Sequence, residues 1–270
     1  MAMAPVSGHL TGRKSSQRYL SGKIIFFAVV SILFALTGVV SAYSGGDGSS
    51  GDPYQINNSA DLIALSVDSG NWSKHFIQTD DISLSGGSPT ETIGNSDDMF
   101  AGTFDGQGNI ISNFTIGKSG FDYIGLFGYL GSGGKITDLT VHAGDAGVSG
   151  RDNVGILVGY NFGTITDCSA MGNATATQYY SGGLIGVNNG LITNCSASGS
   201  ATAIISDAGG LVGWNNGTAT ITNSFATGNA KASHEHAGGL VGSNYGTITN
   251  CYATGITHAN DYNAGGLVGD

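Results

Sequence analysis

The chain has 270 residues, of which 47 are glycine and only 3 are proline, and its charged fraction is 10%. A collagen would need glycine at every third position with abundant proline, and a disordered chain would need high charge with few apolar residues. Because 40% of this chain is hydrophobic and its glycines follow no such period, both classes are excluded. The chain is long enough to bury a sizeable core.

The first 42 residues form a predicted export segment. Four basic residues come first: Arg13, Lys14, Arg18 and Lys23. An apolar run follows at 24–40, and Ser41 and Ala42 supply the small residues of a cleavage context. The run is longer than the roughly 7 to 15 residues of a usual signal core and close to the roughly 17 that span a bilayer. We expect cleavage near Ala42, and an uncleaved N-terminal membrane anchor is the alternative.

Beyond residue 42 the chain is strongly acidic. It holds five basic residues against 19 acidic ones, a formal net charge of −14. The basic residues are widely spaced: Lys74, Lys118, Lys135, Arg151 and Lys231. Binding to a phosphate backbone needs clustered Lys or Arg, so we expect no nucleic-acid partner. The acidic balance is typical of a protein that stays soluble outside the cell, and contact with a membrane is expected only through the N-terminal segment.

Two segments connect the export segment to the rest of the chain. Residues 43–57 are rich in Gly and Ser, which predicts a flexible linker. Residues 58–100 are predicted to cap the end of the following domain. Asn58 is a helix N-cap residue with Asp61 three positions on, and a short helix through Leu62 would cover an otherwise open edge.

A phrase of the type Gly-Gly-Leu-Val-Gly recurs along residues 101–270. Its closing glycine falls at Gly128, Gly159, Gly186, Gly213, Gly242 and Gly269, at spacings of 31, 27, 27, 29 and 27 residues. Each phrase is followed by an Asn-x-Gly turn and a strand of the Thr-Ile-Thr-Asn-Cys type, for example at 244–246 and 247–251. These segments lack the apolar spacing of three and four that an amphipathic helix needs, so short strands joined by turns are predicted.

An Asn or Asp inside each strand is predicted to bend it. Ile165 and Cys168 are three residues apart, so in a straight strand their side chains would face opposite sides. A left-handed residue between them, Asp167, would let both face inward, and Asn and Asp enter the left-handed region more readily than most residues. The predicted bend residues are Asn113, Asp138, Asp167, Asn194, Asn223 and Asn250.

Stacked coils would place equivalent residues above one another at the inter-strand spacing of roughly 4.8 Å. The first predicted inward ladder is Ile111, Ile136, Ile165, Ile192, Ile221 and Ile248. The second is Phe114, Leu139, Cys168, Cys195, Ser224 and Cys251, and the third is Leu126, Leu157, Leu184, Leu211, Leu240 and Leu267. A single coil cannot bury its own apolar face, whereas stacked neighbours can, which explains the recurrence.

The repeated phrase, with its Asn-x-Gly turn and Thr-Ile-Thr-Asn-Cys strand, resembles the GLUG-motif repeat of secreted bacterial and archaeal surface proteins. The stretch 102–114, Gly-Thr-Phe-Asp-Gly-Gln-Gly-Asn-Ile-Ile-Ser-Asn-Phe, is similar to the first coil of pectate-lyase-like β-helices. The resemblance covers roughly residues 100–270. It implies an all-β fold, a right-handed parallel β-helix (solenoid) with coils of about 27–31 residues, a short N-terminal capping helix and an incomplete last coil. Members of the family are mostly adhesin-like proteins without an assigned reaction, so it implies no catalytic residue.

All three cysteines lie at one ladder position, so their spacing follows the coil and resembles no zinc motif. Cys168 and Cys195 on adjacent coils would come close to each other. Side chains that point the same way in a ladder nevertheless have poor disulfide geometry. Buried free thiols are therefore predicted.

Carboxylates and histidines provide two candidate sites. Asp138 and Asp167 on adjacent coils would lie roughly 5 Å apart, near the separation found in retaining glycosidases. The other coils hold Asn there, which indicates a bend residue instead of a catalytic pair. His234 and His236 flank Glu235, but the His-Glu-x-x-His spacing is absent and no third ligand is near in sequence, so a solvated loop is predicted.

Aromatic residues recur at two positions of the repeat. They are Tyr129, Tyr160 and Trp214 directly after the closing glycine, and Phe162 and Tyr245 in the turn. Facing outward, they would form a partial stripe suited to stacking on sugars or to a protein partner. Packing between neighbouring turns is the alternative, because the aligned positions also hold Val187 and Ser243.

Sequons for N-glycosylation are frequent in this Asn- and Thr-rich chain. They occur at Asn57, Asn71, Asn113, Asn173, Asn194 and Asn216. Two of them, Asn113 and Asn194, lie on predicted bends and are expected to be too enclosed for modification.

The sequence predicts an exported cell-surface structural or adhesive β-helix module without intrinsic catalysis, cofactor or metal site. A cell-surface glycan or a protein is the expected class of partner. The alternative is a carbohydrate-active β-helix enzyme, either a polysaccharide lyase or a glycoside hydrolase, or a glycan-binding module. Such an enzyme should cluster carboxylates with Lys or Arg on one face, and the sequence offers only Lys135 near Asp138.

Overall fold

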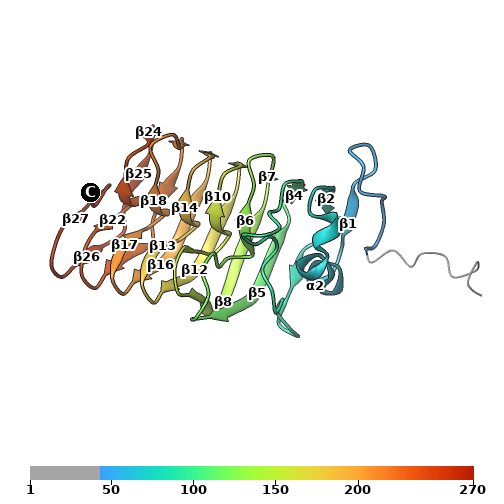
Figure 1. The fold of residues 1–270 in the computed structure, drawn as a ribbon, viewed down its shortest axis with the longest axis horizontal. Coiled ribbons are helices and arrows are strands. Elements are labelled where there is room, and N and C mark those ends of the chain that lie inside the picture. The colour runs from blue at the N-terminus through green and yellow to red at the C-terminus, as the bar shows by residue number, and fades with distance from the viewer. Residues whose placement is uncertain (1–42) are drawn as a thin grey trace, which may run out of the picture. The chain divides into compact units, whose positions relative to one another are not determined.

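Residues 43–270 are described by a computed structural model, and residues 1–42, with the predicted export segment, lie outside the described residues. The described chain winds into coils that follow one another along one axis (Figure 1). The parallel β-solenoid predicted from the repeat is confirmed, with about seven turns and, among the described residues, a single α-helix. No helix within residues 43–270 is long and apolar enough to span a membrane.

The strands form four sheets, named A to D, in which neighbouring coils pair in parallel. Sheet A contains β1 (Tyr54–Ile56), β2 (His75–Gln78), β4 (Thr103–Asp105), β7 (Lys135–Thr137), β11 (Thr164–Thr166), β15 (Leu191–Thr193), β19 (Thr220–Thr222) and β24 (Thr247–Thr249). Sheet B contains β3 (Ile82–Ser83), β5 (Ile110–Lys118), β8 (Thr140–Gly150), β12 (Ser169–Ala176), β16 (Ser196–Ala203), β20 (Phe225–Ala226), β21 (Asn229–Ala232), β25 (Tyr252–Ala253) and β26 (Thr257–Ala259).

Sheets C and D are formed by the two strands at either end of the glycine-rich phrase. The sheet D strand comes before the phrase's leucine and the sheet C strand after it. Sheet C contains β6 (Phe127–Leu130), β10 (Val158–Asn161), β14 (Ile185–Asn188), β18 (Val212–Asn215) and β23 (Val241–Asn244). Sheet D contains β9 (Val154–Gly155), β13 (Tyr179–Gly182), β17 (Ser206–Gly209), β22 (Ala237–Gly238) and β27 (Ala264–Gly265). A full coil therefore runs from sheet A to B, D and C and returns to A through the Asn-x-Gly turn. The coil that begins at β24 has an isolated bridge, Val241–Val268, in place of a sheet C strand.

Asn and Asp residues are left-handed at the predicted positions, although Asn113 lies within β5, where the pairing register shifts. The φ angles of Asn113, Asp138, Asp167, Asn194, Asn223 and Asn250 are 61, 50, 54, 54, 51 and 53°. All six lie in the left-handed region, which Asn and Asp tolerate better than other side chains. In the coil that starts at β15, Ile192 and Cys195 are both buried although they are three residues apart. The left-handed bend therefore lets both side chains face the core, although their spacing of three would place them on opposite sides of a straight strand.

Apolar ladders fill the inside of the stack. Ile136, Ile165, Ile192 and Ile221 pair in register on sheet A and are fully buried. The leucine ladder is equally buried from Leu126 to Leu240. In the last coil Leu267 is 39% exposed, since none of the described residues covers that side of it.

The first residues of two ladders differ from those predicted. Phe104 of β4, and not Ile111, pairs with Ile136 on sheet A. Ile111 and Phe114 belong to β5, which pairs with β8 in sheet B. The prediction was wrong here because Gln107, with φ 51°, makes the bend in this coil. Residues 110–114 resemble the repeated strand in sequence, but they already lie in the next sheet, sheet B.

The β-helix begins before residue 101. β1 pairs with β2 and β2 pairs with β4, so sheet A extends back to Tyr54 through the segments predicted as linker and cap. The residues before β1 are bonded to it: Ser44 N donates to Gln55 O, and Gln55 N donates to Gly45 O. These coils lack the Gly-Gly-Leu-Val-Gly phrase, so the repeat could not reveal them.

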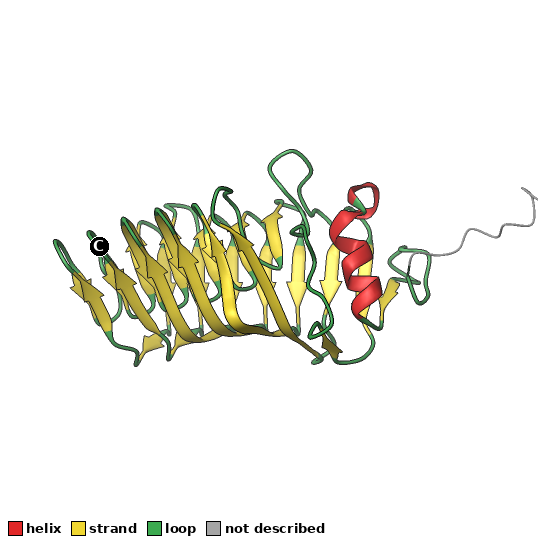
Figure 2. Ribbon diagram, turned by 90° about the horizontal axis from the view of Figure 1, so that it is seen from below, coloured by secondary structure: helices red, strands yellow, loops and turns green. Residues whose placement is uncertain are grey.

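A short helix caps the N-terminal end of the stack, as predicted (Figure 2). The helical segments are α2 (Ser59–Val67) and the 3₁₀ turn η1 (Ser69–Asn71). Asn58 Oδ1 accepts hydrogen bonds from the backbone N–H groups of Ala60 at 2.9 Å and Asp61 at 3.2 Å, which satisfies two of the free donors at the helix start. Leu62 and Leu65 are fully buried, so the helix adds its apolar face to the core.

A buried ladder of amides fixes the turn between sheets C and A. Its members are Asn161, Asn188, Asn215 and Asn244, the first residue of each Asn-x-Gly turn. Each Nδ2 donates to the Oδ1 of the next asparagine, at 2.7, 2.8 and 2.7 Å. Asn188 Oδ1 also accepts from the backbone N–H of Gly190. Because buried amides must find partners, the turn residue of one coil requires the same residue in the next.

Two glycines of each phrase are required because backbones meet there. A Cβ on Gly186 in sheet C would lie 2.4 Å from the carbonyl carbon of Asn153, at the start of the sheet D strand in the preceding coil. A Cβ on Gly182, which opens the phrase, would lie 2.0 Å from the carbonyl oxygen of Ile185. Real Cβ atoms essentially never come closer than 3.0 Å to such neighbours. The Leu-Val pair is therefore enclosed by two positions that admit only glycine.

Gly186→Ala is expected to lower the free energy of unfolding by about 2–3 kcal/mol, because the new Cβ overlaps backbone that cannot move like a flexible side chain. Gly120→Ala is the control, since nothing lies within 4 Å of a Cβ there, and its effect should stay within about 0.5 kcal/mol. Urea unfolding followed by circular dichroism measures both. Equal effects of the two substitutions would contradict this account of the phrase.

Candidate functional site

The aromatic residues predicted as a stripe lie on sheet C. The paired positions along the sheet are, in order, Tyr129, Tyr160, Val187, Trp214 and Ser243. The three rings are half-buried, and none belongs to the apolar core of the solenoid. They lie on the outer side of the sheet. The predicted outward orientation and the alternative, packing between neighbouring turns, therefore both hold.

The first ring cluster spans two coils. Tyr129 and Tyr160 stack with centroids 5.0 Å apart and planes 20° apart, and Phe162 stacks on Tyr129 at 5.8 Å. Tyr123 meets Tyr129 and Tyr160 edge-on, each at 5.4 Å. Burial raises the pKa of Tyr123 and of Tyr129. The stacked rings are spaced much like the coils, roughly 4.8 Å apart, so each ring covers a face of its neighbour in the next coil.

The second ring cluster lies further along the same side. Trp214 and Tyr245 stack at 4.9 Å with planes 28° apart, and Tyr180 meets Trp214 edge-on at 5.2 Å. Val187 separates the two clusters and is only 5% exposed. The exposed members are Phe162 and Tyr245, at 40% and 57%. The name aromatic face is used below for Tyr123, Tyr129, Tyr160, Phe162, Tyr180, Trp214 and Tyr245.

Tyr123 and Tyr180 share a repeat position that the sequence predictions overlooked. The position two residues before the opening glycine holds Tyr123, Asn153, Tyr180, Asp207, His236 and Asn263. The first four have φ of 61, 56, 61 and 63°. From this left-handed corner, the side chain reaches the outer side of sheet C in the next coil: Tyr123 reaches Tyr160 and Tyr180 reaches Trp214. The signal in the sequence was the fixed distance from the glycine.

Asp207 at this position forms a buried polar cluster. The carboxylate is 3% exposed; its Oδ1 accepts from Ser243 Oγ and lies 3.1 Å from His236 Nδ1, and its Oδ2 accepts from Ser206 Oγ at 2.8 Å. Asp, His and Ser also form hydrolytic triads, but there the Asp and the Ser bond opposite nitrogens of the imidazole. Here Ser243 Oγ lies 3.2 Å from the same Nδ1 and is almost fully buried. The cluster joins two coils and exposes no nucleophile.

The two histidines of the predicted solvated loop have different surroundings. His234 is exposed and lies 2.7 Å from Asp261, as expected for such a loop. For His236 the prediction was wrong, because its ring packs on Asp207 and is only partly exposed. Within residues 43–270, no group of three or more His, Cys, Asp or Glu side chains is placed to hold a metal ion.

Asp138 and Asp167 lie in the exposed ladder of bend residues. Amide donors join most of this ladder: Asn194 Nδ2 donates to Asp167 Oδ1 at 2.9 Å, and Asn223 Nδ2 donates to Asn194 Oδ1 at 3.3 Å. Between Asp138 and Asp167 no amide is available to donate. The left-handed bend accounts for both residues, and the pair stands out only as two like charges on adjacent coils.

The cysteines are free thiols, as predicted, with Cys168 and Cys195 buried and Cys251 half-buried. Each buried Sγ donates to the carbonyl oxygen two residues before it, Thr166 or Thr193, at 3.2 Å. The neighbouring Cys195 thiol and burial raise the pKa of the Cys168 thiol. Cys168 and Cys195 pack within the apolar core, so this ladder position belongs to the core.

Two sequon asparagines are more exposed than predicted. Asn113 and Asn194 have exposed side chains, because the left-handed bend turns them away from the core. Asn113 Nδ2 donates to Ser83 Oγ at 2.9 Å. Their amides are engaged with the preceding coil, but they are not enclosed.

The GLUG motif, as a family, matches residues 177–202, 206–231 and 233–257. Each matched range contains one strand of sheet D, then one of sheet C and one of sheet A. Residues 177–257 of the chain therefore carry GLUG-motif repeats. The repeated phrase of the family is thus the one whose glycines lie at the contact between sheets C and D.

Two relatives share these repeats. Halomucin of Haloquadratum walsbyi is 35% identical over 145 residues, which are 51% of this chain and 2% of halomucin. A candidate Gly-rich membrane protein of Evansella cellulosilytica is 33% identical over 163 residues, which are 56% of this chain and 19% of that protein. This GLUG-repeat chain therefore spans a small part of the length of both relatives.

A solved structure has the same fold. The crystal structure of a candidate immunoglobulin A1 protease from Bacteroides ovatus, at 1.30 Å resolution, superposes with a TM-score of 0.73 and 24% identity. The superposition covers 84% of this chain and 74% of that one. At this identity the likeness establishes the β-helix and leaves the activity open.

Asp138→Asn is expected to stabilise the GLUG-repeat chain by about 0.5 kcal/mol at low salt, since it removes a like-charge pair on adjacent coils and adds an amide donor toward Asp167. Asn194→Asp, which places a charge beside Asp167 and removes the amide that donates to it, should destabilise by a similar amount. Urea unfolding at low salt and at about 1 M salt measures both, and the effects should shrink at high salt because the screening length falls to about 3 Å. Destabilisation by Asp138→Asn would show that the carboxylate has a role other than the bend.

Proposed function

We propose that this chain is an exported, non-catalytic module of a cell-surface protein, a rigid β-helix that adheres to a neighbouring surface protein through its aromatic face. The observation that carries the proposal is the pair of ring clusters held on the outer side of sheet C, with Phe162 and Tyr245 exposed. Tyr and Trp dominate the energetic centres of protein interfaces. A preformed solenoid presents them with little ordering cost on binding.

The direction of stacking favours a protein over a glycan as the partner of this face. A sugar that stacks needs a free ring face, whereas each ring of a stacked pair already has one face covered by its neighbour. The edges of the stacked rings stay uncovered by the stacking, and ring edges are electropositive. Carbonyl and carboxylate oxygens of a protein surface complement such edges, so a protein contact makes fuller use of them.

A non-catalytic role is supported by how the reactive side chains are used. Asp207, His236 and Ser243 bond to one another between coils, and Asp138 and Asp167 make the bends between sheets A and B. A general acid or base must be free to reach a substrate proton, and these groups already hold the stack together. The protease name of the Bacteroides ovatus neighbour does not carry over, because that likeness concerns the fold.

The proposed location rests on two supports. One relative is named as a membrane protein, and the first 42 residues have the composition of an export segment. Both relatives are many times longer than the matched region, which supports the role of a module within a larger surface protein.

Trp214→Ala is expected to weaken binding of the purified module to cell envelopes of its source organism at least tenfold, a loss of about 1.4 kcal/mol or more. Tyr245→Ala, which removes an exposed ring, should act in the same direction with little effect on folding. Leu191→Ala, an exposed apolar residue on sheet A, is the control and should bind like the unmodified module. Binding is measured by co-sedimentation, and circular dichroism checks that each variant is folded.

Pretreatment of the envelopes identifies the partner class. Protease treatment should abolish binding and periodate oxidation of sugars should leave it intact. Loss of binding on periodate treatment alone would overturn a protein as the partner, and equal binding by Trp214→Ala would overturn the adhesive role of the aromatic face. Cleavage in a panel of polysaccharides that depends on Asp138 or Asp167, tested with Asp138→Asn and Asp167→Asn, would overturn the non-catalytic role.

A further inference from the structure

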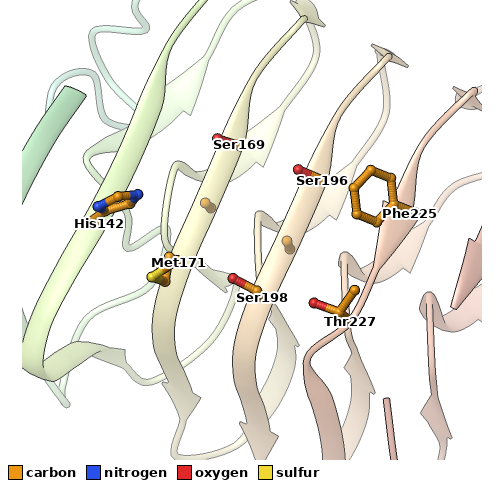
Figure 3. A pocket seen from close by; sticks show the side chains of 9 residues that line it. His142, Ser169, Met171, Ser196, Ser198, Phe225 and Thr227 are labelled. Atoms are coloured by element: carbon orange, nitrogen blue, oxygen red, sulfur yellow. The ribbon is translucent and has the colours of Figure 1, made fainter. Parts of the chain in front are cut away.

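The outer side of sheet B carries a hollow of about 210 Å³, on another part of the coil from the aromatic face. Its lining residues come from β8, β12, β16, β20 and the residues just after β20: His142, Ser169, Ala170, Met171, Ser196, Ala197, Ser198, Phe225 and Thr227. Figure 3 shows the serine side chains of β12 and β16 between His142 on one side and Phe225 on the other. The hollow therefore extends across four neighbouring coils.

The register of sheet B explains the shape. Ser169 pairs with Ser196, and Ser196 pairs with Phe225, so two short hydroxyl side chains precede a large ring along one ladder. In the parallel ladder His142 pairs with Met171, and Met171 pairs with Ser198, so large side chains precede a short one. The serines of β12 and β16 lie between the longer side chains of His142, Met171 and Phe225, which leaves a depression with a polar floor.

Phe225 forms a firm apolar wall. Its ring stacks on that of Tyr252 in the next coil, with centroids 4.9 Å apart and planes 1° apart. Phe225 itself is only half-exposed. The stack braces the ring from the far side, so the side toward Ser196 is a preformed apolar surface.

Hydroxyl groups on the floor are open to a ligand. Ser169 Oγ lies 3.0 Å from Thr140 Oγ1, which satisfies one of its bonds. The hydroxyls of Ser196 and Ser198 make no hydrogen bond to another group within residues 43–270. Each can both donate and accept. A ligand rich in hydroxyls would match them, since each bond needs a donor on one side and an acceptor on the other.

The charge of the lining limits the class of ligand. None of the nine lining residues is Asp, Glu, Lys or Arg, and His142 is the single titratable group among them. A charged ligand would leave water without gaining an opposite charge, which is unfavourable. The volume is below the roughly 300 Å³ at which pockets for drug-sized ligands begin, so a small ring is the appropriate size.

We propose that this hollow binds one neutral sugar ring. The sugar hydroxyls bond to Ser196 and Ser198, and an apolar side of the sugar packs against Phe225. The hydroxyl ladders run along the solenoid axis at the coil spacing of roughly 4.8 Å, so the ring can be one unit of a longer chain that follows the axis. The site is separate from the aromatic face, and it stands whether or not that face is adhesive.

The test uses the folded chain and a panel of sugars in NMR titrations: the methyl glycosides of glucose, galactose and mannose, with glucuronate and galacturonate as charged counterparts. At least one neutral glycoside should bind saturably in the millimolar range and shift amides of β12 and β16. The uronates should bind at least tenfold more weakly. No saturable shift with any neutral glycoside, or a preference for the uronates, overturns the proposal.

Three substitutions test whether the sugar binds in the hollow. Ser198→Val removes a hydroxyl and narrows the hollow with a side chain that suits a strand, and it should weaken binding at least tenfold. Ser200→Val, on the same strand but outside the lining, is the matched control and should bind like the unmodified chain. Trp214→Ala should leave sugar binding unchanged, which separates this site from the aromatic face. Unaltered binding by Ser198→Val, or a loss with Trp214→Ala in a folded protein, would contradict the assigned site.

Discussion

Close contact between the backbones of sheets C and D governs the architecture of this GLUG-repeat chain. The closing glycine of one coil lies against the first residues of the sheet D strand in the coil before it, with no space for a Cβ. This contact folds the phrase so that its leucine points into the core. It also brings the outer side of sheet C next to the left-handed corner of sheet D, where the rings of Tyr180 and Trp214 and the Asp207 cluster meet.

In-register stacking explains why so many polar residues recur. A buried asparagine in one turn needs an amide in the next, and a bend residue pairs with the bend residue above it. These groups are committed to contacts between coils. Functional variety is therefore expected on outer positions that depart from the repeat, because the stack does not fix them. Both proposed surfaces have this origin. On sheet C one position holds Tyr, Tyr, Val, Trp and Ser in successive coils, and on sheet B Phe225 follows Ser196 in the next coil.

The sequence predicted the parts of the candidate sites that lie on the strands themselves. Tyr129, Tyr160 and Trp214 were recognisable by their place after a glycine. Tyr180 and Asp207 also have a fixed place before a glycine, but their contact with sheet C could not be read from it, because it is made across two coils and around a corner. The hollow on sheet B was also beyond the sequence, since it depends on the relative sizes of side chains in four different coils.

What the sequence determined by itself was the period, the left-handed bends, the inward ladders and the capping helix. Each of these depends on residues close together in the chain, and stacking repeats them without change. Only the tertiary structure decided where the β-helix begins, which residue pairs with Ile136, how His236 is buried, and which hydroxyls share a hollow. The physical reason is that these features depend on contacts between coils, where an inserted residue or a larger side chain changes the neighbours without changing the pattern.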